Sequence, residues 1–141
     1  MPQGEKPVPV PDDASAGYWA AAARHELALP RCRACGTYSL PPTLVCGGCA
    51  TTDPQYEYVK VDGAGRVRSW TIVRDAFLPG FAADVPYVLV DVELDAQPEL
   101  RMIGRLTAGA DVRLHLDARV AIAFDDIAPG VAVPAFAPVD A

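Results

Sequence analysis

The sequence predicts a mainly β protein in which an N-terminal helix precedes a rubredoxin-like zinc ribbon and a five-stranded OB-fold barrel. Two observations carry this prediction. The four cysteines form two Cys-x-x-Cys pairs that are separated by ten residues, and such paired spacing is typical of zinc ribbons. After residue 55, five runs of strand length are separated by turn residues. Five short strands are too few for an immunoglobulin-type sandwich and suit a small Greek-key barrel.

Composition limits the classes of function. The chain has 141 residues, of which 51% are hydrophobic and 21% charged, and its net charge is −6. An acidic balance argues against a nucleic-acid surface, whose usual mark is a basic stripe. The N-terminus leads into no apolar signal segment, and no apolar run is long enough to span a bilayer. We therefore expect a cytoplasmic globular protein.

Composition shifts divide the chain into four parts. Four prolines and no periodic pattern mark the start as a flexible linker, and strand patterns begin after the cysteines. The expected parts are a linker at 1–11, an N-terminal helix at 12–26, a zinc ribbon at 27–54 and an OB-fold domain at 55–141.

An alanine-rich run predicts the helix, from Ala14 to His25. Three polar residues can cap its start: Asp12, Asp13 and Ser15. Trp19 is the one large apolar residue on its face and is expected to dock on the rest of the chain. His25 falls in the last turn, where a cation suits the helix dipole, so a capping role is favoured over metal binding or catalysis.

The four cysteines are the candidate metal ligands: Cys32, Cys35, Cys46 and Cys49. Each Cys-x-x-Cys turn can aim both sulfurs at one point, and two facing turns make a tetrahedral cage that suits Zn²⁺. Gly36 and the pair Gly47-Gly48 allow the tight backbone of such turns. A site with four sulfur ligands leaves no open position for substrate, so the metal is expected to be structural.

Other uses of the cysteines are a disulfide pair, a redox dithiol, an iron centre or idle thiols. Disulfides require an exported chain, and a redox Cys-x-x-Cys needs no second pair and usually opens a helix. Iron in the same cage is the main remaining alternative to zinc. Residues 27–29 and 38–40 flank the first pair, and we expect them to form a short hairpin with the metal at its tip.

Five strands are expected in the barrel, separated by Gly, Asp and Pro: Tyr56–Val61, Gly65–Arg74, Pro86–Leu94, Leu100–Thr107 and Arg119–Ile127. Residues 112–116 suit either a sixth short strand or a bend. His115 in that segment is expected to be exposed on the barrel.

No catalytic motif is present in the sequence. It contains no Gly-x-Ser-x-Gly, no phosphate-binding loop and no His-x-x-x-His pair. Zinc would occupy every cysteine, and both histidines have structural explanations. We therefore expect the chain to lack catalytic residues of its own.

The loop at residues 75–85 joins two expected strands yet carries Phe77, Leu78 and Phe81. Apolar side chains in a loop need something to cover them. Either the loop folds over the mouth of the barrel or it is a protein interface, and large apolar anchors favour the interface.

The order of these features resembles one family, the zinc-ribbon and OB-fold proteins associated with acyl-CoA metabolism. The resemblance covers residues 12–138 and is carried by Tyr18-Trp19, Cys32–Gly36, Pro41-Pro42, Cys46–Cys49, Gly65-Arg66-Val67-Arg68-Ser69-Trp70-Thr71 and Pro86-Tyr87-Val88. Members of this family are partner subunits or domains of thiolase-like enzymes, including the sterol-carrier-protein type, or of hot-dog-fold enoyl-CoA hydratases.

The resemblance implies an accessory role in binding acyl-CoA. It suggests a subunit that completes the site of a thiolase-like retro-aldolase, a carbon-carbon lyase of steroid side-chain degradation. A partner domain of an enoyl-CoA hydratase is the first alternative. In either complex, Arg66, Arg68 and Arg74 are candidates to receive the phosphates of CoA, since guanidinium groups bind phosphate in a bidentate manner; the simpler explanation is a solvated charged face.

A nucleic-acid-binding OB module is the second alternative. OB-folds bind single strands through a basic groove with stacking aromatics, and Trp70 and Tyr87 could serve as such platforms. The same two side chains could equally pack a barrel or an acyl chain. The acidic total charge disfavours this class of function.

Overall fold

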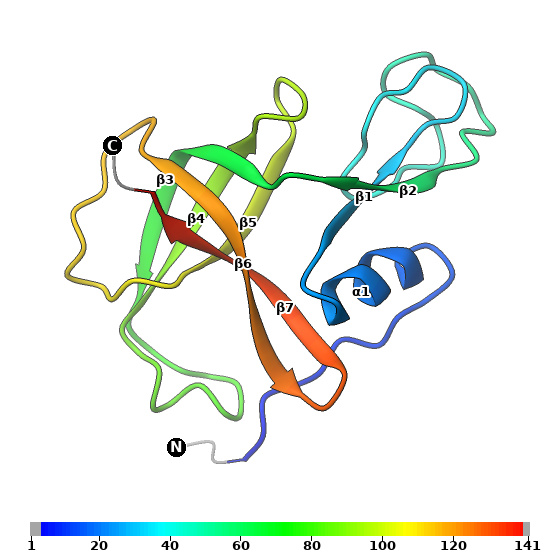
Figure 1. The fold of residues 1–141 in the computed structure, drawn as a ribbon. Coiled ribbons are helices and arrows are strands. Elements are labelled where there is room, and N and C mark those ends of the chain that lie inside the picture. Colours follow the sequence, from blue (N-terminus) through cyan, green and yellow to red (C-terminus); the bar gives the residue numbers. More distant parts are fainter. Residues whose placement is uncertain (1–3, 140–141) are drawn as a thin grey trace.

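The computed structural model describes residues 4–139, which form a closed five-stranded barrel and a smaller part with a helix, a two-stranded sheet and the cysteine loops (Figure 1). The elements in chain order are α1 (Ala16–Ala23), β1 (Leu27–Arg31), β2 (Glu57–Val61), β3 (Ala64–Val73), β4 (Tyr87–Leu94), β5 (Arg101–Leu106), β6 (Arg119–Ala128) and β7 (Val131–Pro138).

The helix α1 is shorter than the alanine-rich run predicted. Asp12 organises its start, because Ser15 N donates to Asp12 Oδ1 at 2.8 Å and Ala16 N donates to the Asp12 carbonyl at 2.8 Å. The helix ends before His25, whose φ of 59° is left-handed. α1 packs against β1 and β7. The half-buried Trp19 lines a hollow between the helix and β7, with Pro9 and Pro11 on the same hollow.

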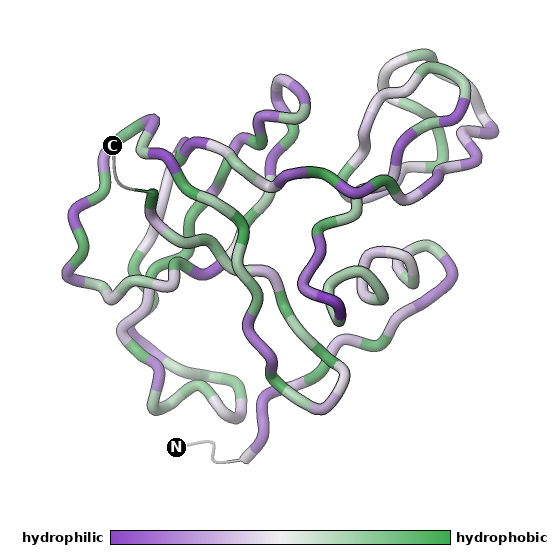
Figure 2. Tube along the Cα trace, viewed as in Figure 1, coloured by the Kyte–Doolittle hydropathy of each residue, from purple (hydrophilic) through white to green (hydrophobic). Residues whose placement is uncertain are grey.

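The barrel has the strand order β3-β4-β5-β7-β6, and β6 closes it against β3. All neighbouring strands are antiparallel except β5 and β7, which are parallel. This Greek-key arrangement confirms the predicted five-stranded OB-fold class. Hydrophobic and hydrophilic residues alternate along several barrel strands in Figure 2, as expected for strands with one face in a core.

The identity of the five strands differs from the prediction at two places. The segment assigned to the first barrel strand is β2, which pairs with β1 from Leu27↔Val61 to Arg31↔Glu57 and lies outside the barrel. The fifth barrel strand is β7, for which no strand was predicted. Its sequence contains two prolines and three alanines, which weaken the local strand signal.

The core of the barrel comes from alternate positions of its strands. Val88, Val90, Val92 and Leu94 of β4 are buried, as their alternation predicts. Phe136 of β7 is completely buried and is the largest side chain at the centre. Two residues of β1, Leu27 and Leu29, belong to the same hydrophobic cluster. The two-stranded sheet therefore shares its core with the barrel.

The hairpin expected between residues 27–29 and 38–40 is reduced to one bridge. Tyr38 pairs with Arg31, and Ser39 N donates to the Pro30 carbonyl at 3.0 Å. β1 instead uses its other edge to pair with β2. A strand has two edges, so the local pattern around the cysteines could not reveal which partner would dominate.

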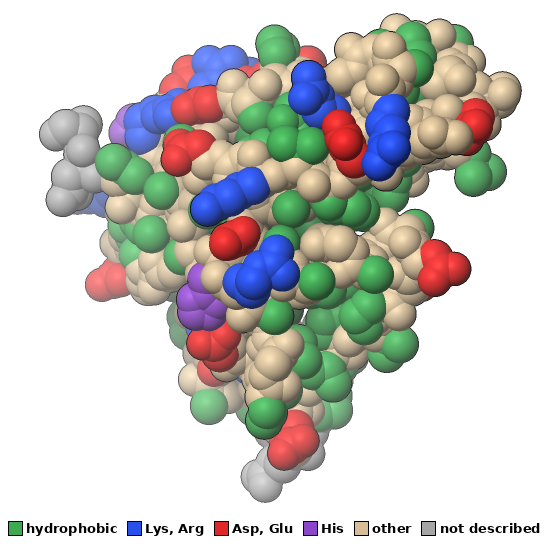
Figure 3. Space-filling view, turned by 45° about the vertical axis from the view of Figure 1, so that its right-hand side comes forward, with side chains coloured by type: hydrophobic (Ala, Val, Ile, Leu, Met, Phe, Trp, Pro, Cys, Tyr) green, Lys and Arg blue, Asp and Glu red, His purple; other side chains and the backbone are tan. Residues whose placement is uncertain are grey.

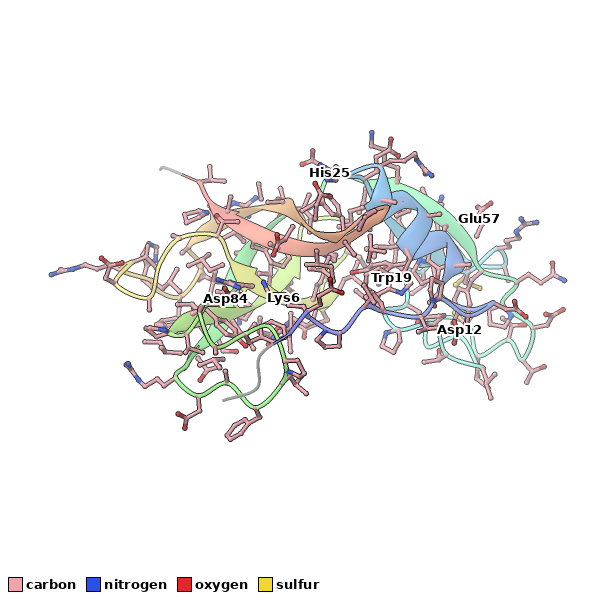
Figure 4. The ribbon with its side chains drawn as sticks, turned by 90° about the horizontal axis from the view of Figure 1, so that it is seen from below. Lys6, Asp12, Trp19, His25, Glu57 and Asp84 are labelled. Carbon is pink, nitrogen blue, oxygen red and sulfur yellow. The ribbon has the colours of Figure 1, made fainter. Side chains whose placement is uncertain are left out.

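The first segment of the chain lies against other elements from residue 4 onward. Lys6 pairs with Asp84 in the β3–β4 loop, and residues 9–11 run toward α1 (Figure 4). Residues 1–3 of the expected linker, and residues 140–141 at the other end, lie outside the described part. Within residues 4–139, none of the helical structure is both long and apolar enough for a bilayer span.

Candidate metal centre and partner surface

The four cysteine sulfurs meet at one point beyond the end of the β1–β2 sheet. Their Sγ atoms all lie within 4.8 Å of one another, with Cys35 and Cys46 at 3.6 Å and Cys32 and Cys49 at 4.0 Å. A tetrahedral Zn²⁺ with bonds of about 2.3 Å requires sulfurs roughly 3.8 Å apart. The residues therefore fit a structural zinc ion, as the spacing predicts.

The two cysteine turns have the same pattern of backbone hydrogen bonds. In the first, Cys32 N donates to the Thr37 carbonyl at 2.9 Å and Gly36 N donates to the Cys32 carbonyl at 2.8 Å. In the second, Cys46 N donates to the Thr51 carbonyl at 3.1 Å and Ala50 N donates to the Cys46 carbonyl at 2.9 Å. The matching turns bring the two cysteine pairs face to face.

The left-handed position of each turn follows its second cysteine. Gly36 has φ 80° in the first turn, as glycine there predicts, but the equivalent residue in the second turn is Ala50 with φ 61°. Gly48 serves a different purpose, because a Cβ there would lie 2.3 Å from Thr37 Oγ1. Gly48 N also donates to Cys46 Sγ at 3.3 Å. Gly48 thus permits the close approach of the two turns.

The two surface cysteines of the site have thiol pKa values that are shifted in opposite directions. Hydrogen bonding with the Thr37 side chain and backbone lowers the pKa of the Cys35 thiol to about 6. At Cys49 a backbone hydrogen bond from Thr51 lowers the pKa, but desolvation and the neighbouring sulfurs outweigh it and raise the pKa to about 11. Such a spread is expected where four thiols crowd one point. A cation at that point would remove the repulsion between thiolates.

The zinc site would be structural. It has four protein ligands and so offers no position for substrate. Two of the ligands, Cys32 and Cys46, are buried, whereas Cys35 and Cys49 lie at the surface. When bound, zinc would join the two turns directly through their side chains.

The predicted interface loop, residues 75–85, divides into an exposed and a packed half. Phe77 is 83% exposed and Leu78 is 57% exposed. Phe81 is half-buried, and its ring lies 6.3 Å from the ring of Tyr87. Figure 2 shows the loop between β3 and β4 as a hydrophobic stretch. The structure therefore brings Phe77 and Leu78 together at the surface and sets Phe81 against the barrel.

The three predicted phosphate-binding arginines have different surroundings. Arg66 contacts Glu93 at 2.7 Å and Asp117 at 3.4 Å, and Arg68 contacts Asp117 at 2.8 Å. Arg74 is exposed just beyond β3. Basic and acidic side chains lie side by side on the face in Figure 3. A phosphate at Arg66 or Arg68 would have to compete with these carboxylates, whereas Arg74 is accessible.

The two histidines lie apart from the cysteines. The His25 backbone takes part in the helix C-cap, because His25 N donates to the Ala22 carbonyl at 2.8 Å. Its side chain turns away from the helix end: Nε2 lies 2.8 Å from Asp126 Oδ1, and the ring stacks on Phe124 at 5.5 Å. The cationic side chain at the helix end is that of Arg24, whose Nη1 donates to the Ala20 carbonyl at 3.1 Å. His115 is exposed, as predicted, in a turn region between β5 and β6.

Fold and site together define a class of protein: a zinc ribbon joined through a shared core to an OB-fold barrel. Comparison with sequence models of known families matches both parts. Residues 19–55 match the "ChsH2, rubredoxin-like zinc ribbon domain" and residues 58–125 match the "ChsH2, C-terminal OB-fold domain". The chain belongs to this ChsH2-type family of zinc-ribbon and OB-fold proteins.

Two relatives extend over nearly the whole chain. A structure described as "Ltp2-ChsH2(DUF35) aldolase" superimposes with a TM-score of 0.77 at 28% identity, covering 92% of this chain and 98% of the matched chain. The "Probable enoyl-CoA hydratase alpha subunit" of Thermomonospora curvata is 28% identical over 137 residues, which are 97% of this chain. The present chain spans only 41% of that relative's length.

A third similarity concerns the fold alone. A protein of unknown function from the DUF35 family of Sulfolobus solfataricus superimposes with a TM-score of 0.53 at 17% identity. The alignment covers 78% of this chain and 77% of that chain.

Proposed function

We propose that this chain is a non-catalytic accessory subunit or domain that binds a thiolase-like aldolase and completes its acyl-CoA site. One observation carries the proposal: the chain matches 98% of a chain in the Ltp2-ChsH2(DUF35) aldolase structure. Because the match covers almost all of that chain, the whole fold is shared, including both the ribbon and the barrel. The proposed substrate class is a β-hydroxyacyl-CoA with a steroid side chain as its acyl group, which the enzyme splits by retro-aldol cleavage.

In this proposal the exposed half of the 75–85 loop contacts the enzyme. Phe77 and Leu78 leave large apolar areas in solvent, and such anchors contribute most when a partner desolvates them. The zinc ribbon would hold β1 and so stabilise the part of the core that Leu27 and Leu29 share with the barrel. CoA would lie at the contact with the enzyme, with Arg74, which directly precedes the 75–85 loop, the most accessible of the predicted phosphate ligands.

The proposal is tested by co-purifying the tagged chain with a thiolase-like protein encoded beside it. Cleavage of a β-hydroxyacyl-CoA is assayed with each protein alone and with the pair, and activity only in the pair is expected. The aldolase role would be refuted if the two proteins formed no complex and if cleavage did not depend on this chain. Assays with β-hydroxyacyl-CoA substrates whose acyl groups increase in size would then define the preferred substrate.

The interface is tested in the same assay with Phe77→Ser and Leu78→Ser, which should weaken the complex at least tenfold while leaving circular dichroism unchanged. Leu44→Ser is the matched control, because Leu44 is 91% exposed and lies in the loop between the two cysteine pairs. If Leu44→Ser disrupts the complex and the loop variants do not, the interface is on the ribbon instead. Charge reversal at Arg74 should raise KM for the CoA substrate in the assembled pair.

A partner domain of an enoyl-CoA hydratase is the second candidate. It is favoured by the match to the hydratase alpha subunit, in which the present chain corresponds to less than half of the relative. The test is pull-down with hydratase subunits followed by a hydration assay of an enoyl-CoA. Hydration that depends on this chain would establish the hydratase role.

A further inference from the structure

The exposed apolar loop is fastened to the start of the chain through one carboxylate. We infer that Asp84 is a positioning residue, which ties the 75–85 loop to the N-terminal segment of residues 4–11 and to β5, and thereby sets how Phe77 and Leu78 are presented. The inference deepens the proposed function, because it rests on this loop being the partner surface. It adds the segment and the residue that hold that surface in place.

Asp84 joins three segments that are far apart in sequence. Its Oδ2 accepts from Lys6 Nζ at 2.7 Å and from Arg105 Nη1 at 2.8 Å. Lys6 and Asp84 point toward each other where the N-terminal segment crosses the loop (Figure 4). The three side chains are 22–34% exposed. A carboxylate shared by two cations at partial burial is better held than an isolated surface pair.

Aromatic rings enclose the same joint. The ammonium of Lys6 lies 5.2 Å from the ring centre of Phe81, and the guanidinium of Arg105 lies 4.7 Å from that of Tyr87. Both distances fall within the range of cation–π attraction. Each cation thus contacts a carboxylate and an aromatic face. This arrangement explains why Phe81 is packed whereas Phe77, four residues earlier, is not.

The backbones of the two segments touch at Gly80. Its φ is 84°, and a Cβ at this position would lie 2.6 Å from the backbone nitrogen of Lys6 and 2.9 Å from its Cα. Only glycine allows this approach. Just beyond it, Asp84 N donates to the Phe81 carbonyl at 2.9 Å, which closes a tight turn. The crossing point therefore fixes the register between segment and loop.

Part of the N-terminal segment borders open space instead of close packing. A pocket of about 280 Å³ lies at the crossing, and its lining includes Lys6, Pro7, Tyr87, Leu89 and Val133. Because open space adjoins the segment, the polar joint at Asp84 supplies a large part of its attachment. Fixing a loop before binding lowers the entropy that association must overcome. Loss of the joint should therefore weaken the partner complex without removing any residue of the interface.

The first test measures ¹⁵N relaxation of the full chain, comparing wild type with Asp84→Asn, Asp84→Glu and Asp95→Asn. Order parameters of residues 5–8 and 77–85 should fall from about 0.8 to below about 0.6 in Asp84→Asn and should be largely retained in Asp84→Glu. Asp95→Asn is the matched control, because Asp95 forms an exposed ion pair with Arg119 outside this joint. Unchanged order in Asp84→Asn, or an equal loss in Asp95→Asn, would overturn the inference.

The second test measures affinity for the thiolase-like partner. Asp84→Asn should raise the dissociation constant about three- to tenfold, and Asp84→Glu should restore most of the affinity. A loop that loosens with no change in affinity would show that Asp84 does not position the partner surface. If Phe77→Ser also leaves the affinity unchanged, the proposed interface fails, and the relaxation data still decide whether Asp84 holds the loop.

Discussion

The side-chain amide of Gln97 binds both main-chain groups of Tyr38. Tyr38 N donates to Gln97 Oε1 at 2.9 Å, and Gln97 Nε2 donates to the Tyr38 carbonyl at 3.0 Å. Tyr38 directly follows the first cysteine turn, and Gln97 lies in the turn between β4 and β5. The side chain thus completes the hydrogen bonding of an extended residue in the ribbon and connects the ribbon to the barrel.

Replacement of Gln97 by Ala should lower the free energy of unfolding by about 1–3 kcal/mol, because two partly buried hydrogen bonds are lost together. Urea unfolding monitored by circular dichroism measures the change. Gln55→Ala is the control, since among residues 4–139 the Gln55 side chain hydrogen-bonds only to the nearby Asp53, at 3.2 Å on the surface. Equal effects of the two substitutions would mean that the Gln97–Tyr38 contact carries little energy.

Purified protein should contain one zinc ion per chain. Structural zinc sites bind with apparent free energies of about 10–16 kcal/mol, so chelation or Cys46→Ser should release the metal and disorder residues 32–51. The barrel should keep its β-sheet circular dichroism, because most of its core lies outside the ribbon. Metal analysis and thermal unfolding check this prediction. Zn²⁺ added after chelation should restore the midpoint temperature of unfolding. Stoichiometric iron would contradict the zinc assignment.

Replacement of Gly17 by Ala should destabilise the protein although alanine favours a helix. The usual gain is about 0.5–1 kcal/mol, but a Cβ on Gly17 would lie 2.5 Å from the Tyr58 ring. Displacing that ring should cost about 1–3 kcal/mol and disturb its hydroxyl, which donates to the Ala14 carbonyl. Thermal unfolding is the measurement. Gly47→Ala is the control, because a Cβ there meets nothing within 4 Å.

Stability should decline in acid through carboxylates that the fold keeps ionised. The Glu99 amide and Arg66 lower the pKa of Glu93 below its ordinary 4.5, and Lys6 and Arg105 lower the pKa of Asp84 below its ordinary 3.8. A group with a lowered native pKa stabilises fully above its unfolded pKa, and this stabilisation disappears as pH falls through the native pKa. The free energy of unfolding should therefore stay nearly constant between about pH 7 and pH 5, and it should decrease once the pH drops below about 4.5.

Glu93→Gln isolates the part of that acid decline that comes from Glu93. Its unfolding free energy should be lower than wild type at pH 7, and the difference should narrow toward pH 3. Urea titrations at several pH values give both curves. Parallel curves at every pH would show that ionisation of Glu93 does not support the fold.

Residues close in sequence determined the metal centre. Paired cysteines at fixed spacing set the ligands, and Gly36 marks the left-handed position of the first turn. Ala50 in the second turn could not be foreseen, because alanine carries no preference for that backbone. The buried face of β4 was likewise visible in its alternating valines, since every second residue of a strand shares a face.

Only the tertiary structure decided which segments pair. β2 and β7 show why: β2 has a strong strand pattern but pairs with β1, and β7 has a weak pattern but is held in the barrel between β5 and β6. Gly17 resembles a helix breaker in sequence, yet it is required by the distant ring of Tyr58. The joint at Asp84 unites residues 6, 84 and 105. Local preference decides which secondary structure a segment can form. Contacts between distant segments decide which strand it pairs with and which charged residues it contacts.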